Sequence, residues 1–94
     1  MSEFSANINW RRDSDDFTYK TFDRSHVWQF PGGQSLKASA APAYFGDSAQ
    51  VNPEEALVAS LASCHMLTFI AYCAMQKFDV DQYQDNATGK LGKL

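Results

Sequence analysis

The stretch NPEEALVASLASCHMLTFIAYCAMQK, residues 52–77, decides the fold because it predicts one long helix. Asn52 is a favourable N-cap and Pro53 suits the first helical position. Glu54 and Glu55 follow and place negative charge at the positive end of the helix dipole. Lys77 places positive charge in the last turn. We therefore expect a helix from residue 53 to about residue 76 or 77.

Apolar side chains surround this helix instead of forming one stripe. Such a helix is stable only when nearly every side is covered. One small sheet in a chain of 94 residues does not provide that cover, so we expect a homodimer whose central helices pack together through small side chains. The apolar residues are Leu57, Val58, Leu61, Met66, Leu67, Phe69, Ile70 and Tyr72, and the small residues are Ala59, Ala62 and Ser63.

The same segment approaches the length of a membrane span. Residues 56–75 are close to the roughly 20 apolar positions that a spanning helix needs. Serine, histidine and threonine interrupt them, which favours a helix inside protein and no membrane partner. The N-terminus lacks a basic region followed by an apolar stretch, and two cysteines do not make a disulfide framework. We therefore expect a cytoplasmic protein.

The first half of the chain predicts strands. Residues 4–10 alternate between apolar and polar, which is typical of a strand with one dry face. Residues 24–30 form a second strand, with Arg24, His26, Trp28 and Phe30 on one face, and residues 31–33 are a strong turn signal. A third strand follows with Leu36, Ala38 and Ala40 on its inner face.

Three further segments complete the expected fold. Residues 17–22 are β-prone without clean alternation, residues 41–51 form a long loop, and residues 80–91 resemble another strand. Together these patterns predict an α+β fold in a single domain, residues 1–94. It has an antiparallel sheet of about three to four strands and one long, buried central helix.

Charge and ligand spacing exclude two classes of partner. The formal net charge is −3, and no run of basic residues extends beyond Arg11 and Arg12, so nucleic acid is not expected. Cys64 with His65 or His26 does not have the spacing of a zinc site, so no metal is expected.

The two cysteines differ in their predicted roles. Cys64 and Cys73 are nine positions apart, about half a turn out of phase and about 13 Å along the axis, so they cannot form a disulfide within one helix. Cys73 is best interpreted as a packing residue. Cys64 is either packing or a nucleophile, and a nucleophile in mid-helix needs a nearby cation to stabilise its thiolate. Arg24 is the candidate, although its head group can also extend to solvent from a strand end.

Two groups of motifs resemble a known family. Residues 52–55 (NPEE) followed by an alanine-rich helix with residues 63–66 (SCHM) resemble the OsmC/Ohr family of organic hydroperoxide reductases. Residues 24–28 (RSHVW) with residues 31–33 (PGG) resemble its OsmC-like subgroup. The resemblance spans roughly residues 7–94 and implies an OsmC-like fold in an intertwined homodimer.

The activity implied by this resemblance is the thiol-dependent reduction of organic hydroperoxides to alcohols. Cys64 corresponds to the peroxidatic cysteine, Glu54 to the glutamate of the Asn-Pro-Glu motif and Arg24 to the active-site arginine. No cofactor is implied. Apolar walls would favour hydrophobic organic peroxides as substrates. The residues expected to form these walls are Trp28, Phe30, Leu61 and Phe69.

Helix geometry constrains how these residues can meet. Glu54 is ten residues before Cys64, roughly 15 Å along one helix, so it cannot serve its own thiol. We therefore expect a composite site, in which Cys64 of one subunit meets Glu54 and Arg24 of the other across antiparallel helices. Without the resemblance, Glu54 and Glu55 are simply acidic residues at a helix start.

The chain departs from the family in its second cysteine. Members carry a resolving cysteine in the C-terminal half, and the disulfide that it forms is reduced by a dithiol such as a lipoyl group. This sequence ends before that region, so we expect a chain truncated at the C-terminus that depends on an external thiol or an intermolecular bridge. The alternative function is a non-catalytic OsmC-like module for dimerisation or for binding a small hydrophobic ligand.

Overall fold

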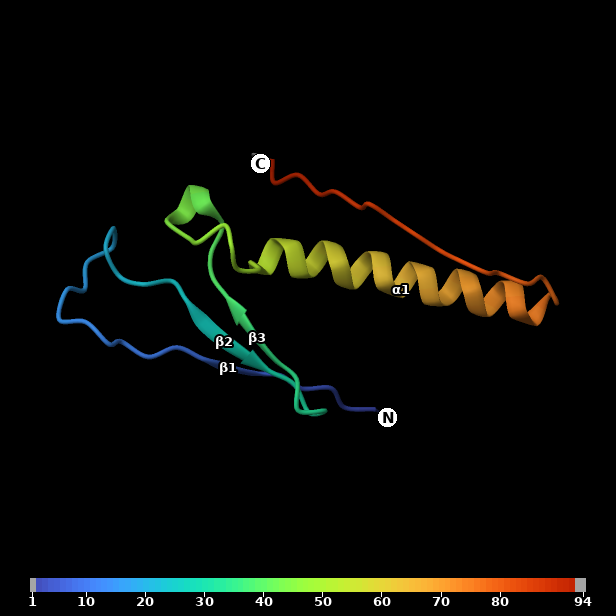
Figure 1. The fold of residues 1–94 in the computed structure, drawn as a ribbon, viewed down its shortest axis with the longest axis horizontal. Helices are drawn as coiled ribbons and strands as arrows, with labels where there is room; N and C mark the ends of the chain where they lie inside the picture. Colours follow the sequence, from blue (N-terminus) through green and yellow to red (C-terminus); the bar gives the residue numbers. More distant parts are fainter. Residues whose placement is uncertain (1, 93–94) are drawn as a thin grey trace. The chain divides into compact units, whose positions relative to one another are not determined.

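The computed structural model describes residues 2–92. It contains three strands, a 3-10 helix and one long α-helix (Figure 1). These are β1 (Asn7–Asn9), β2 (His26–Gln29), β3 (Ser35–Ala38), η1 (Pro42–Tyr44) and α1 (Pro53–Met75). The chain divides into two compact units, residues 1–53 with the sheet and residues 54–94 with nearly all of α1. The predicted α+β composition with a three-stranded antiparallel sheet and one long helix is confirmed.

The sheet is antiparallel in the order β1-β2-β3. Trp28 of β2 lies opposite Ile8 on one side and Leu36 on the other. The predicted turn joins β2 to β3: the Phe30 N–H donates to the Gln34 carbonyl and the Gly33 N–H donates to the Phe30 carbonyl, both at 3.0 Å. Gly33 has a φ of 95°, a conformation that side chains with a Cβ rarely adopt. This turn therefore fixes the register of β2 and β3.

The structure corrects the predicted strand at residues 4–10. β1 covers only Asn7–Asn9, and all of its residues are exposed, so the predicted dry face is wrong for this chain. β1 is the edge strand of the sheet and pairs with β2 alone. On β3 the prediction holds in part, because Ala38 is buried while Leu36 is exposed.

Residues 17–22 form a turn and not a strand. The amide groups of Thr21 and Phe22 donate to the Thr18 carbonyl at 3.1 and 3.0 Å. The Thr18 N–H donates to the Thr21 hydroxyl oxygen at 3.1 Å, which supports the same turn. These local hydrogen bonds compete with strand pairing, which agrees with the absence of clean alternation in the sequence.

The long loop after β3 is closed on itself around Ser39, which is 1% exposed. The Ser39 N–H donates to the Val51 carbonyl at 2.8 Å, and the Ser39 hydroxyl oxygen accepts the Asp47 N–H at 3.0 Å. Gly46 lies so close to the Ala40 carbonyl that a Cβ would overlap it. The loop thus returns the chain beside β3 just before α1 begins.

Helix α1 has the predicted bounds to within two residues, and its C-terminus explains why the chain turns back. Lys77 has a φ of 62°. The Phe78 N–H donates to the Cys73 carbonyl at 2.8 Å, and the Lys77 N–H donates to the Ala74 carbonyl at 3.0 Å. This pair of bonds is a Schellman motif, with lysine at the position where glycine is usual.

Residues 78–92 then run back beside α1 toward its N-terminal end (Figure 1). The rings of Tyr83 and Phe69 lie 6.0 Å apart, and a Cβ on Gly89 would come within 2.8 Å of a methyl carbon of Val58. The predicted strand at residues 80–91 is wrong, because no strand of the described chain pairs with it. Side-chain contacts with the helix take the place of a hydrogen-bonded ladder.

The returning segment covers α1 only in part, and its further burial in a homodimer stays a prediction. One stripe of α1 is half-buried or buried, and Cys73, at 8%, is the one helix residue classed as buried. Length and composition alone would let α1 cross a membrane, a property shared by core helices of soluble proteins. The stripe comprises Val58, Ala62, Met66, Ile70 and Cys73.

The cap at Lys77 gives a stability prediction. Lys77→Gly should raise the free energy of unfolding by about 1 kcal/mol, because glycine adopts a positive φ without the steric cost of a Cβ. Urea unfolding followed by tryptophan fluorescence and far-UV circular dichroism measures the change. Lys77→Ala is the matched control, since it removes the same charge and keeps the Cβ. Equal changes in the free energy of unfolding for the two substitutions would contradict a steric cost of the Cβ at position 77.

Candidate functional site

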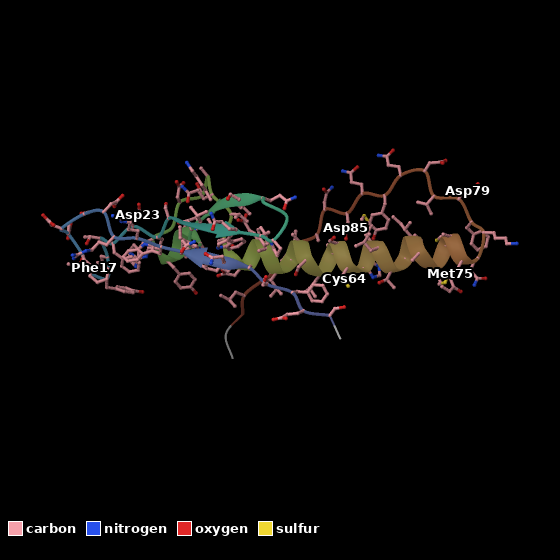
Figure 2. The ribbon with its side chains drawn as sticks, turned by 90° about the horizontal axis from the view of Figure 1, so that it is seen from below. Phe17, Asp23, Cys64, Met75, Asp79 and Asp85 are labelled. Atoms are coloured by element: carbon pink, nitrogen blue, oxygen red, sulfur yellow. The ribbon has the colours of Figure 1, made fainter. Side chains whose placement is uncertain are left out.

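Cys64 lies in the middle of α1 and is exposed, whereas Cys73 is buried. Figure 2 shows Cys64 on one side of the helix and Asp79 and Asp85 on the other. Cys64 and Cys73 are nine positions apart in the sequence, which places the two thiols on opposite faces of the helix. Cys73 therefore faces the covered side of α1, and Cys64 faces the exposed side.

The exposed side of α1 that carries Cys64 has a regular pattern, which we call the Cys64 face. Its members are spaced alternately by four and three residues, the spacing with which one helix packs along another. Sequence reasoning missed this face because apolar residues occur all around the helix. In the structure, residues 78–92 cover one side of α1 and leave the other side exposed. The Cys64 face comprises Leu57, Leu61, Cys64, Thr68, Ala71 and Met75, all exposed.

Arg24 lies two residues before the start of β2 and is half-buried. One terminal nitrogen donates to the Phe22 carbonyl at 2.7 Å and the other donates to the Tyr19 carbonyl. The guanidinium carbon lies 3.5 Å from the centre of the Phe22 ring, and the rings of Tyr19 and Phe45 are at 5.4 and 5.2 Å. The guanidinium is therefore held by carbonyl oxygens and π faces.

The Phe22 ring belongs to an aromatic cluster. Its centre lies 5.6 Å from that of Phe17 and 6.2 Å from that of Trp10, and the Trp10 indole N–H donates to the Asp23 carbonyl at 2.7 Å. Sequence reasoning missed this cluster because its members are on both sides of a turn. The sequence feature that could have indicated the cluster is the high density of aromatic residues in residues 17–22, which lack strand alternation.

The other predicted site residues lie in both units. On β2, Trp28 is half-buried, with its ring 6.1 Å from that of His26, and Phe30 follows the strand and is exposed. On α1, Leu61 is exposed, and the exposed Phe69 contacts Tyr83. The substrate pocket that these residues were expected to form stays a prediction.

Glu54 is exposed in the first turn of α1, and the helix continues without interruption to Cys64 and beyond. About 15 Å of helix axis therefore separates these residues within one chain. His65 is exposed beside Cys64. Among residues 2–92, no group of three or more His, Cys, Asp or Glu side chains is arranged to hold a metal ion.

Comparisons with known proteins point to one family. A family model described as OsmC-like protein matches residues 46–93. A solved structure of an OsmC-like protein of unknown function from Vibrio cholerae is similar to this chain, with 47% sequence identity and a TM-score of 0.93. The match covers 100% of this chain and 64% of the Vibrio protein, so the chain spans less than two thirds of that protein's length. No curated protein sequence matches.

The contrast between the two thiols predicts their accessibility. Under native conditions Cys64 should be labelled by a maleimide, and Cys73 should react only after denaturation, because its side chain is buried. Mass spectrometry of the digested protein measures both sites. The Cys64→Ser and Cys73→Ser variants provide the single-thiol controls. Equal labelling of both cysteines in the native protein would contradict the observed packing.

Proposed function

This chain belongs to the OsmC-like protein family, and we propose that it reduces organic hydroperoxides through a peroxidatic Cys64. The observation that carries the proposal is the exposure of Cys64, since a thiol that serves only as packing would be covered like Cys73. Cys64 also has apolar neighbours on its face, which suit a substrate with a hydrocarbon body.

The proposed reaction is a displacement on oxygen. The Cys64 thiolate attacks one peroxide oxygen, an S–O bond forms and the O–O bond breaks. Sulfur is oxidised to a sulfenic acid, and the peroxide is reduced by two electrons. The departing alkoxide takes up a proton and leaves as the alcohol.

Arg24 and Glu54 are the proposed partners of the thiol. A guanidinium stabilises both the thiolate and the negative oxygen that leaves, through charge-assisted hydrogen bonds. Glu54 would orient the arginine through a paired hydrogen bond. Since Glu54 and Cys64 lie far apart on one helix, the proposal keeps the composite arrangement, in which a second copy of the chain provides Glu54.

Regeneration of the thiol needs a reductant. The chain has two cysteines, and Cys73 is buried on the opposite face of α1 from Cys64. The proposal therefore assigns reduction of the sulfenic acid to an external dithiol, of which a lipoyl group is one type. A dithiol can form a mixed disulfide with Cys64 and then release it with its second sulfur.

The exposed apolar surface of α1 supports a second candidate function, that of a non-catalytic module for dimerisation or for binding a hydrophobic ligand. Leu57 and Leu61 are 60% and 63% exposed on the Cys64 face. Large apolar residues gathered on one side of a helix are typical of an interaction surface. The two candidates share a homodimer and differ in whether Cys64 reacts.

Hydroperoxide treatment tests the peroxidase proposal. With cumene hydroperoxide, the chain should form a sulfenic acid on Cys64, detected by mass spectrometry of its dimedone adduct, and release one equivalent of alcohol. Cys64→Ser should abolish both products. Cys73→Ser should keep the rate within about twofold, because Cys73 only fills space. Loss of reaction in the Cys73 variant alone, or no adduct in the unmodified chain, would contradict the proposal.

The homodimer is tested by placing a charge on the Cys64 face. Leu57→Glu should weaken dimerisation by about a hundredfold, because a desolvated, unpaired carboxylate costs about 3 kcal/mol. Light scattering over a dilution series measures the mass. Gln82→Glu adds the same charge at an exposed position of the returning segment and should leave the dimer intact. A monomer at every concentration before any substitution would remove the composite site.

A further inference from the structure

We propose that Phe22 is a positioning residue, which holds the Arg24 guanidinium flat so that its remaining N–H donors can bind an anion. The proposal concerns the geometry of Arg24 itself. Its consequence at Cys64 rests on the proposed function, in which that anion is the thiolate or the departing oxygen.

The hydrogen bonds of Arg24 leave part of its donor capacity unused. A guanidinium has five N–H donors in a fixed plane. Two terminal nitrogens donate to the carbonyls of Phe22 and Tyr19. The neighbouring carboxylate of Asp23 accepts the Ser25 N–H at 2.9 Å. The recorded partners of the guanidinium in the described chain are thus dipoles and rings, and none of them carries negative charge.

Ring contacts restrict how the guanidinium can turn. The Phe22 ring lies 3.5 Å from its carbon, the separation of direct stacking. Tyr19 and Phe45 stand at 5.4 and 5.2 Å, within the range of cation–π attraction. Their own rings meet edge to face at 5.7 Å. The half-buried cation therefore lies beside three aromatic rings, while hydrogen bonds to two carbonyls restrict its rotation.

Phe22 can act as a platform because it is anchored in turn. Phe17 and Trp10 pack on its ring at 5.6 and 6.2 Å. Its backbone N–H donates to the Thr18 carbonyl at 3.0 Å. The platform therefore keeps its place before any ligand arrives.

This arrangement has a physical advantage for binding an anion. An arginine that is free to rotate loses rotamer entropy when it binds, at about 0.5–1.5 kcal/mol for such a side chain. Arg24 has already lost that freedom during folding. Its plane also suits a ligand that accepts two hydrogen bonds, which the point charge of a lysine does not match.

Substitution at Phe22 tests the proposal in the full chain. Phe22→Leu should free the Arg24 side chain, seen by ¹⁵N NMR as faster exchange of its Nε–H with water. Alkylation of Cys64 by iodoacetamide at neutral pH should then slow by about three- to tenfold, because a mobile cation stabilises the thiolate less well. Phe22→Tyr keeps the ring and should restore both signals. Phe4→Leu removes a ring that is 90% exposed and does not belong to this cluster, and it is the matched control.

The outcomes separate this proposal from the proposed function. Equal loss of the Nε–H signal in Phe22→Leu and Phe4→Leu would overturn the positioning role. If Arg24→Met slows the alkylation of Cys64 and Phe22→Leu does not, the positioning role is also wrong. The peroxidase proposal is then unaffected. If Arg24→Met leaves Cys64 unchanged, the assigned role of Arg24 in the reaction is wrong, and the Nε–H signal alone decides the positioning role.

A second variant covers the case in which Phe22→Leu lowers the folded fraction. Phe45 contacts Arg24 and Tyr19 but is outside the cluster of Trp10, Phe17 and Phe22. Phe45→Leu should increase Nε–H exchange to a smaller extent, as expected from the longer distance. If Nε–H exchange does not change in this variant, the aromatic rings do not position the Arg24 guanidinium.

Discussion

The rest of the structure depends on the apolar circumference of α1, which one chain of this size covers along a single stripe. The Schellman motif at Lys77 reverses the chain, and the segment that follows packs on the stripe that ends at Cys73. This choice divides the helix into two environments. It makes Cys73 an interior residue and leaves Cys64 exposed on the other side of the helix.

Local signals were sufficient for the elements that local physics determines. Asn52 and Pro53 marked the helix start, and the turn at residues 31–33 is observed with Gly33 at positive φ. The predicted strand at residues 80–91 failed because alternation shows which residues suit a sheet and does not show whether a partner strand exists. The burial of α1 in a homodimer stays a prediction, since a sequence reveals that a helix needs cover and not which molecule provides it.

The candidate site was predictable in its residue types and not in its surroundings. Cys64 stands out in the sequence because a thiol interrupts an apolar helix, and Arg24 stands out as a charge beside aromatic residues. The rings that hold Arg24 come from Tyr19, Phe22 and Phe45, which depend on a turn and on the loop around η1. Such contacts join distant positions, and no periodicity in the sequence encodes them.

Placing Cys64 on the uncovered face creates a conflict that limits how a second copy can bind. A partner that covered the whole face would protect α1 from water and would also block a peroxide from the thiol. The composition of the face offers a resolution, since its two leucines, Leu57 and Leu61, lie on the N-terminal side of Cys64, and Met75 lies at the far C-terminal end. The next members toward the C-terminus are the smaller Thr68 and Ala71. Contact centred on the leucines would leave room beside the smaller residues, so one helix face can serve both association and access.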